Sequence, residues 1–268
     1  RLTPTPLPRK DSVNGELVDP CSEQFSGFVF KIQANMNKNH RDRIAFLRIC
    51  SGKFERGMEA FHVQEGKNIK LATGTSLMAD DRAIVSEAYA GDIIGLFDPG
   101  VFSIGDTLCT GKKHVQFAGI PTFAPEHFAR VTQVDTMKRK QFVKGMEQIA
   151  QEGAIQIFKT PYTGMEEVIV GVVGTLQFDV LEYRLKNEYN VELYMEGLPY
   201  EYLRWIETDD GEPVKEEDLI LGTDVKLVED YKGNKLLLFS SFWSIKWVTD
   251  HNPQLVLTEF NERTDEED

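Results

Sequence analysis

Hydrophobic residues change their spacing near Val134, and this change divides the chain into two kinds of structure. Between Phe25 and Val134 they come in short runs rich in β-branched and aromatic side chains, which glycines separate at close intervals. Many short strands with regular glycine turns and no helical period are typical of a closed or nearly closed β-barrel. We therefore expect an all-β barrel domain over residues 25–134.

The residues after Val134 show a helical period instead. One face of a predicted helix carries apolar residues at spacings of 1, 3, 3 and 1, namely Phe142, Val143, Met146, Ile149 and Ala150. Asp135 or Thr136 can cap the start of this helix, and Gly153 is placed to end it in the left-handed conformation.

Strand and helix patterns then alternate. We predict strands at 154–158 and 168–173, a helix at 176–189, strands at 191–194 and 202–206, a hairpin from 225–228 and 236–239, and a last short helix containing Phe242 and Val248. This order favours a compact α+β domain over 135–268, with helices packed on a sheet. A length of 268 residues agrees with two domains, at about 150 residues each.

The composition excludes several classes of protein. Hydrophobic residues make up 41% of the chain and charged residues 27%, which is ordinary for globular domains and excludes a wholly disordered chain or collagen. The longest apolar runs, such as 236–239, are far shorter than the ~20 residues that a membrane-spanning helix needs. The three cysteines lie far apart without CxxC spacing, so no zinc or redox motif is available, and reduced thiols suit the cytoplasm.

The first 24 residues hold four of the eleven prolines and few bulky apolar side chains. We expect residues 1–24 to form an extended, proline-rich interdomain linker rather than a packed element. The chain opens with Arg1 rather than Met and shows no apolar signal segment, so we expect it to be part of a longer protein.

The formal charge of −13 is unevenly distributed. An acidic loop at 207–218 has seven acids and one base, and an acidic tail at 259–268 has six acids and one base, so together they carry −11. Such runs are usually solvated loops or tails. The stretch 38–56, in contrast, has six bases and two acids, a charge of +4.

This basic stretch has two interpretations. It can be an exposed strand face, or it can bind phosphates, because its cations lie around one predicted hairpin. The candidate contact residues are Lys31, Lys38, His40, Arg41, Arg43 and Lys53. Binding of this kind would be mostly electrostatic and would weaken steeply with salt.

The sequence offers no catalytic constellation. It has neither a GxSxG nor an HExxH motif, and its five histidines are isolated. The stretch 105–113 imitates a phosphate loop, but its glycines are one residue too far apart and Lys113 stands where Ser or Thr would hold magnesium. The stretch 37–40 has the start of a guanine-reading motif without its carboxylate. We therefore predict no catalytic residue, no metal site and no cofactor in these residues.

Whole segments nevertheless resemble a known family. The second domain of translational GTPases has counterparts here in residues 25–35, 40–46, 51–57, 90–95 and 104–108. More specific sequence segments resemble the bacterial class II peptide chain release factors, the release factor 3 family. These segments are residues 31–35, 40–43, 117–121, 123–126, 171–180 and 189–192. The resemblance extends from the proline-rich segment to about Trp205.

The resemblance implies the portion of a termination GTPase that docks on the ribosome, through ribosomal RNA and ribosomal proteins. In that family GTP drives a ribosomal rearrangement that expels the class I release factor after the peptide has been freed. It also implies a GTP-binding domain ahead of the barrel, with GTP and magnesium bound there; no guanine-nucleotide motif stands in this chain, so we expect that domain to lie outside it. A cytoplasmic monomer that binds neither membrane nor DNA follows as an expectation.

Two other functions remain open. One is that the chain is the second and third domains of an elongation-factor-type GTPase. Residues 176–179 argue against this function, because they are Leu-Gln-Phe-Asp where an elongation factor is expected to have Gly-Glu-Leu-His. The other is a β-barrel interaction module unrelated to ribosomes, for which contact with ribosomal RNA would be weak and insensitive to salt.

Overall fold

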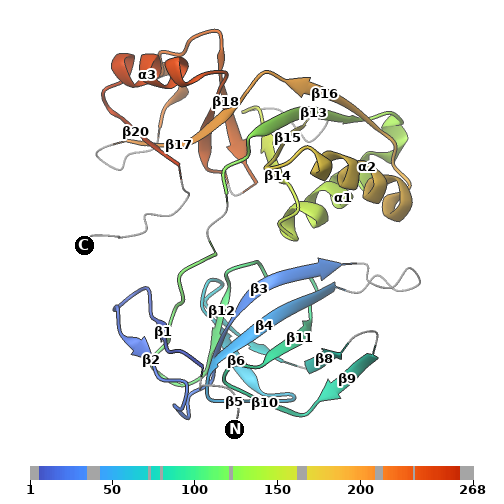
Figure 1. Ribbon diagram of the computed structural model, residues 1–268, viewed down its shortest axis with the longest axis vertical. Helices are drawn as coiled ribbons and strands as arrows, with labels where there is room; N and C mark the ends of the chain where they lie inside the picture. Colours follow the sequence, from blue (N-terminus) through green and yellow to red (C-terminus); the bar gives the residue numbers. More distant parts are fainter. Residues whose placement is uncertain are drawn as a thin grey trace. The chain divides into compact units, whose positions relative to one another are not determined.

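A computed structural model describes residues 6–34, 43–71, 74–78, 81–120, 123–161, 168–208, 214–231 and 233–259. The chain divides into two compact units. The first unit contains Arg1–Ile120 together with Gln151–Gly153, and the second contains Pro121–Ala150 and Ala154–Asp268. Figure 1 shows strands throughout the first unit, and strands with helices in the second.

The first unit is built on one antiparallel sheet whose strands follow the order β7-β6-β12-β3-β4-β11-β8-β9. Its strands are β3 (Ser26–Ala34), β4 (Arg43–Ser51), β6 (Glu59–His62), β7 (Lys67–Lys70), β8 (Gly74–Met78), β9 (Asp81–Val85), β11 (Ile93–Phe97) and β12 (Thr107–Cys109). A separate pair joins β5 (Lys53–Glu55) to β10 (Glu87–Tyr89).

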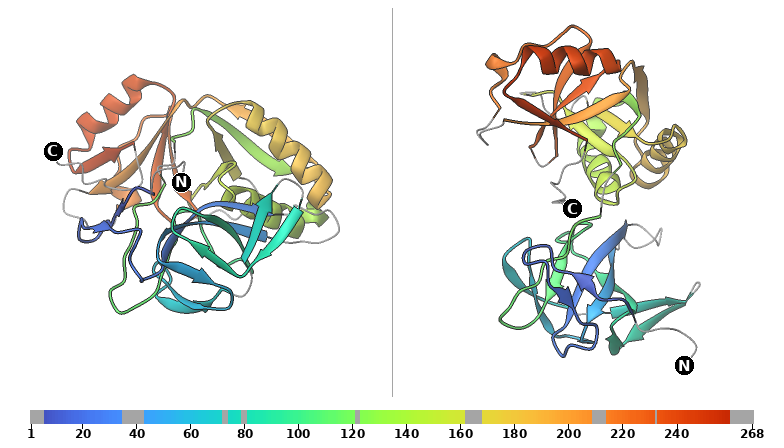
Figure 2. Two further views of the ribbon diagram at one scale, coloured as in Figure 1. Left: turned by 60° about the horizontal axis from the view of Figure 1, so that its bottom comes forward. Right: turned by 60° about the vertical axis from the view of Figure 1, so that its left-hand side comes forward.

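The main sheet curls, as two views show (Figure 2), and an apolar core lies inside the curl. A register shift between Val29 and Lys31 interrupts the pairing of the two longest strands, β3 and β4. Such an irregularity increases local twist and bends a strand. Residues from both halves of the sheet, such as Val29, Leu47, Ile94 and Leu108, therefore meet in a single cluster. The sheet is a curled half-barrel, which agrees with the predicted barrel class.

The N-terminal segment packs against the outside of this sheet. Its strands β1 (Arg9–Lys10) and β2 (Leu17–Val18) pair with each other, and Asp11 forms a backbone bridge to Phe117. Asp11 is 1% exposed, and its Oδ1 accepts a hydrogen bond from the backbone N–H of Gln116. The expected unpacked linker over 1–24 is therefore wrong for these residues, because buried contacts hold the segment in place.

The second unit contains another antiparallel sheet, in the order β16-β13-β15-β14-β18-β19-β17-β20. Its strands are β13 (His127–Gln133), β14 (Gln156–Lys159), β15 (Val168–Val172), β16 (Leu193–Leu198), β17 (Tyr202–Thr208), β18 (Val225–Asp230), β19 (Lys235–Phe239) and β20 (Leu255–Thr258). Its helices are η1 (Thr136–Lys138), α1 (Arg139–Gln151), α2 (Leu176–Tyr189), η2 (Glu216–Asp218) and α3 (Phe242–His251).

Helices α1 and α2 cover one face of the β16-to-β14 half of this sheet. Phe142 and Met146 from α1 and Leu181 from α2 are fully buried against strand residues such as Val170. The two helices approach closely because Gly145 has no side chain; a Cβ there would clash with Leu185. This packing confirms the predicted α+β class with helices on a sheet.

The opposite face of the sheet packs against itself. Phe128 and Ile169 from one half share a cluster with Leu203 and Leu238 from the other half. Helix α3 then covers the outer side of the second half, where Val248 contacts the cluster that contains Phe239. The sheet thus folds over, and both of its halves carry a helical layer.

The predicted helices are confirmed, and Asp135 caps η1, directly ahead of α1, by accepting a hydrogen bond from Met137. The expected barrel boundary at 134 differs from the structure, because β13 pairs with β15 and β16 and the units divide after Ile120. Strand β20 was not expected. Of the acidic loop and tail, residues 209–213 and 260–268 lie outside the described residues.

Among the helices that the structure describes, none is both long enough and apolar enough to span a bilayer.

Candidate functional site

The stretch that imitates a phosphate loop is part of the first unit's sheet. Residues 107–109 form β12, which pairs with β3 on one side and β6 on the other. The backbone N–H of Thr107 donates to Gln64, and that of Thr110 donates to the carbonyl of Phe25. Because these N–H groups are already used, the stretch cannot present them to a phosphate.

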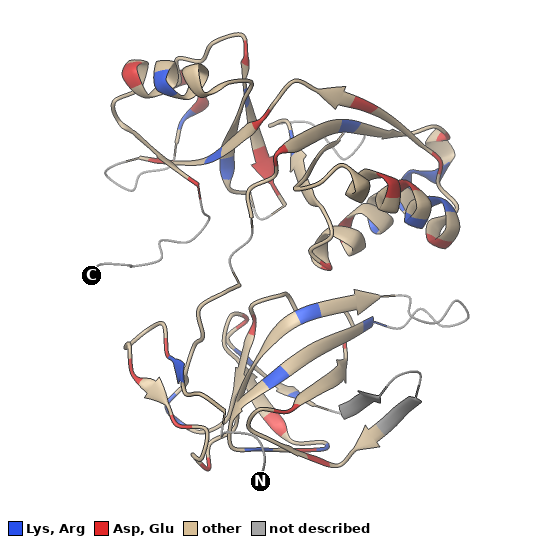
Figure 3. Cartoon of the chain, viewed as in Figure 1, with Lys and Arg blue, Asp and Glu red and all other residues tan. Residues whose placement is uncertain are grey.

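The outer face of β3 and β4 carries Lys31, the candidate contact residue that the structure describes as exposed, together with Arg48. Lys31 on β3 is exposed, and its Nζ lies 5.8 Å from the centre of the Phe46 ring on β4. Phe30 packs against the same ring at 6.3 Å between centroids. Arg48 is also exposed and stands opposite Phe28 in the strand register. Figure 3 shows how few other charges β3 and β4 carry.

We call Lys31, Arg48, Phe30 and Phe46 the β3–β4 face. Lys31 and Arg48 make no ion pair with any residue that the structure describes, and the two rings are half-buried. Unpaired cations beside partly exposed rings can bind phosphates and contact a stacked base or sugar. Arg48 belongs to the basic stretch but was not among the candidate contact residues; its place between the apolar Leu47 and Ile49 is the sequence signal that could have identified it.

Arg43 is not part of this face. Its Nε lies 2.6 Å from Oδ2 of Asp98, and the side chains of both residues are buried. A second guanidinium nitrogen donates to the carbonyl of Phe102 at 2.8 Å. The structure therefore contradicts Arg43 as an exposed phosphate contact, because its charge is already neutralised inside the unit.

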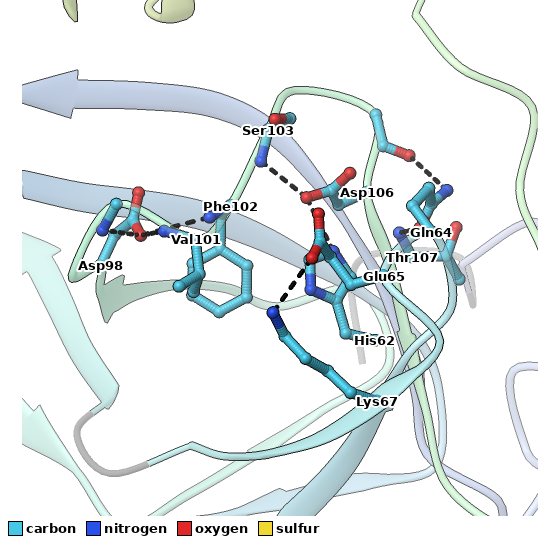
Figure 4. Close-up of polar contacts among 12 residues, drawn as sticks. His62, Gln64, Glu65, Lys67, Asp98, Val101, Phe102, Ser103, Asp106 and Thr107 are labelled. Carbon is cyan, nitrogen blue, oxygen red and sulfur yellow. Dashed lines mark hydrogen bonds and ion pairs between the residues drawn. The ribbon is translucent and has the colours of Figure 1, made fainter.

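Asp98 orders the loop that the Arg43 side chain also contacts. Its Oδ1 accepts hydrogen bonds from the backbone N–H groups of Gly100, Val101 and Phe102, as Figure 4 shows for part of this network. One carboxylate thus orders a loop and pairs with a cation. The arrangement stabilises the unit.

A second buried pair supports the same region. His62 is fully buried, and its Nε2 lies 2.8 Å from Oδ2 of Asp106 (Figure 4). The same carboxylate accepts a hydrogen bond from the backbone of Ser103. His62 therefore follows the ordinary pattern of a packed histidine. Within the described residues, no group of three or more His, Cys, Asp or Glu side chains could hold a metal ion.

Lys53 also forms ion pairs with carboxylates. Its Nζ lies 2.8 Å from Glu87 and 2.9 Å from Glu55. The hydrogen bond with Glu87, followed by that with Glu55, raises the pKa of the Lys53 ammonium. Two acids around one base give a local charge of −1, which is a poor environment for a phosphate. The remaining candidates, Lys38, His40 and Arg41, lie outside the described residues, as does the guanine-motif imitation at 37–40.

The N-terminal segment adds one cation that sequence reasoning missed. The guanidinium carbon of Arg9 lies 3.7 Å from the centre of the Phe28 ring, and burial lowers the pKa of this arginine. Cys50 lies in the same small cluster with Phe28 and Phe117. Burial raises the pKa of its thiol to about 11, so it remains protonated and is no nucleophile at neutral pH.

The comparisons with known proteins cover both units. Residues 117–249 match the family described as Class II release factor RF3, C-terminal domain, and residues 24–111 match Elongation factor G domain 2. The chain is 52% identical over 256 residues to Peptide chain release factor 3 of Symbiobacterium thermophilum, covering 96% of this chain and 47% of that protein. It is 49% identical over 253 residues to Peptide chain release factor 3 of Listeria welshimeri, covering 94% of this chain and 47% of that protein.

The chain thus spans about half the length of the curated relatives it matches. A crystal structure of a protein from Thermus thermophilus is similar in fold, with a TM-score of 0.55 and 18% identity. That similarity covers 80% of this chain and 32% of the other.

Proposed function

Because this chain belongs to the class II release factor 3 family, we propose that it is the ribosome-docking portion of a translational GTPase. In this proposal the whole protein promotes dissociation and recycling of class I release factors after the peptide has been freed. The observation that carries the proposal is the identity of about half of all residues with proteins named Peptide chain release factor 3, across both units.

The second unit favours this function over that of an elongation factor. The match to Elongation factor G domain 2 is confined to residues 24–111, whereas the class II release factor match continues to residue 249. The sequence at 176–179, Leu-Gln-Phe-Asp, also favours a release factor over an elongation factor.

Contact with ribosomal RNA would use the β3–β4 face. Lys31 and Arg48 would bind phosphates without reading bases, which suits a factor that recognises a surface of fixed shape. The curled sheet beneath them holds both cations on rigid strands. Docking helps termination only if the contacts differ between two ribosomal states, since equal affinity for both would shift neither population.

GTP and magnesium would bind in a domain outside these 268 residues. We therefore expect the purified chain neither to bind nor to hydrolyse GTP. Equilibrium dialysis with labelled GTP and magnesium tests this expectation, and tight binding would contradict it. The class I release factor would be an indirect partner, reached through the ribosome. The chain would act as a monomer in the cytoplasm, without binding DNA or membrane.

The experiment that tests docking is co-sedimentation of the chain with purified bacterial 70S ribosomes across a salt titration. We expect binding that weakens as salt rises. The double variant Lys31→Glu with Arg48→Glu should lower affinity by about a hundredfold, since two phosphate contacts become repulsive. The control is Lys70→Glu with Lys112→Glu, which reverses two exposed charges outside the β3–β4 face.

Arg43 is left unchanged in this test because reversing a buried, paired charge would unfold the unit. Equal losses in the two double variants would mean that the β3–β4 face is not the docking surface. Binding of the unsubstituted chain that does not respond to salt would argue for a non-ribosomal interaction module.

A further inference from the structure

Helix α1 begins with a concentration of positive charge that the proposed function does not use. Residues 136–146 contain four bases and no acid, in a chain whose formal charge is −13. The bases are Lys138, Arg139, Lys140 and Lys144. They lie in the second unit, on a different sheet from the β3–β4 face. We call these four residues the α1 cation cluster.

Packing forces the cluster outward. Phe142, Met146 and Ile149 point into the core beneath the helix, and all three are 0% exposed. Lys140 and Lys144, four residues apart, share the opposite side of α1 and are exposed. Arg139 is exposed as well, and Lys138 is half-buried in the turn that precedes the helix. The charges are therefore fixed on a rigid support.

Nearby acids do not neutralise the lysines. Lys138, Lys140 and Lys144 form no ion pair with any described residue. The Asp135 side chain accepts a hydrogen bond from the backbone of Met137 instead. On the adjacent end of α2, which Gly145 contacts, Lys186 pairs with Glu192 at 3.5 Å. Like charges at such spacing repel one another, so the surface is most favourable when an anion lies against it.

The fold decides which kind of anion fits. A helix that lies on a membrane inserts its apolar face into the bilayer, but the apolar face of α1 is already buried in the protein. Lysines bind phosphate as point charges, and an exposed helix cannot enter the narrow major groove of an RNA helix. A run of cations on one helix therefore fits closely spaced phosphates along the outside of an RNA backbone.

We propose that the α1 cation cluster is a second RNA-phosphate-binding surface, which holds the second unit on ribosomal RNA. This inference rests on the proposed function, since the RNA is taken to be ribosomal. The two cationic surfaces lie on separate units, so together they bind RNA at two places. Docking by both would fix the second unit as well as the first.

The experiment measures co-sedimentation with purified 70S ribosomes for a triple variant, Lys138→Gln, Lys140→Gln and Lys144→Gln. We expect affinity to fall about tenfold or more near 0.1 M salt, and the slope of log affinity against log salt to become smaller by about 2. The matched control is Lys70→Gln, Lys112→Gln and Lys246→Gln, which removes three exposed lysines elsewhere. The tryptophans, all in the second unit, verify by their fluorescence that the triple variant is folded.

The outcomes separate this inference from the proposal beneath it. Failure of the unsubstituted chain to bind ribosomes overturns both. Normal binding with an unchanged salt slope in the α1 variant, or an equal loss in the control, overturns the inference alone. A photo-crosslinking residue at position 140 provides a second readout: crosslinks to ribosomal RNA support the inference, and crosslinks only to ribosomal protein overturn it.

Discussion

The two units of this chain are stabilised in different ways. The first unit buries titratable side chains in pairs, such as Arg43 with Asp98 and His62 with Asp106, and uses their carboxylates to order the loop between residues 98 and 106. The second unit buries almost only apolar side chains, and its buried polar residues are Ser244 and Asn252 among those described. The loops of the first unit's sheet have backbone N–H groups that need hydrogen-bond acceptors, and buried carboxylates supply them. In the second unit, helices form most of their backbone hydrogen bonds internally.

The tryptophans make this difference measurable. All three, Trp205, Trp243 and Trp247, belong to the second unit. Their fluorescence therefore follows the unfolding of the second unit alone, while hydrogen exchange of individual peptides follows the first.

The largest effect is expected from Asp98→Ala in the first unit. The substitution leaves the buried Arg43 charge without its carboxylate partner and removes the acceptor for three backbone N–H groups. We expect a loss of about 3–5 kcal/mol in the free energy of unfolding of this unit. Hydrogen exchange should accelerate in peptides from β3, β4 and β11, while the tryptophan transition stays in place.

The variant Asp98→Asn serves as the control, because its amide oxygen can still accept from the loop. It should cost less than Asp98→Ala. Equal exchange rates in Asp98→Ala and the unsubstituted chain would show that the buried pair does not stabilise the first unit.

Leu181→Ala tests the apolar side of the comparison. Leu181 is 0% exposed in the cluster between α2 and the sheet, so its truncation leaves a cavity. We expect a loss of about 2–5 kcal/mol, seen as a lower denaturation midpoint of the tryptophan signal. The neighbouring Val180→Ala, at a position that is 50% exposed, should change stability by no more than about 0.5 kcal/mol. Similar losses at both positions would contradict the packing described here.

A smaller loss should follow from Asn252→Ala at the end of α3. The buried Asn252 amide donates to the carbonyls of Ile220 and Val248 and accepts from the backbone N–H of Ile220. Removing it takes away the side-chain partner of the part-buried N–H and carbonyl of Ile220, at a cost of about 1–3 kcal/mol. The tryptophan transition measures this cost. Asn187→Ala, which removes one exposed hydrogen bond to Tyr183, is the matched control and should have less effect.

The smallest expected effect concerns the reactivity of the cysteine thiols. Cys21 is exposed, whereas Cys50 is buried and its thiol has a pKa raised to about 11. At pH 8 a disulfide reagent should therefore modify Cys21 quickly and Cys50 only after unfolding. Because the unfolded thiol ionises at a lower pH than the folded one, the contribution of Cys50 to stability should fall as pH rises from about 9 to about 11. Rapid modification of Cys50 at pH 8 would contradict its burial.

Periodicity predicted the helices of the second unit, because each packs one apolar face on the sheet, as Phe142 and Met146 do. It misplaced the domain boundary, since the alternating pattern of β13 resembles that of the preceding strands and does not reveal which sheet the strand joins. The linker prediction relied on prolines, but Asp11 and Phe117 meet only in the folded chain.

The candidate site was harder to predict because charge counts do not reveal partners. Arg43 and Lys53 contributed to the basic stretch in the same way as Arg48. Their carboxylates, Asp98 and Glu87, come from distant parts of the sequence, and only the strand order brings them together. The sequence signal that distinguishes Arg48 from Arg43 and Lys53 is its place between two apolar residues, Leu47 and Ile49, in the strand pattern.

The bridge between the N-terminal segment and the end of the first unit has a mechanical consequence. Asp11 pairs with Phe117, and the backbone and hydroxyl of Ser12 both donate to the carbonyl of Gln116. The chain therefore enters and leaves the first unit side by side. A pull between residues 6 and 120 would be carried by these few bonds at the entrance, and the long strands β3 and β4 would bear no load until the bonds broke.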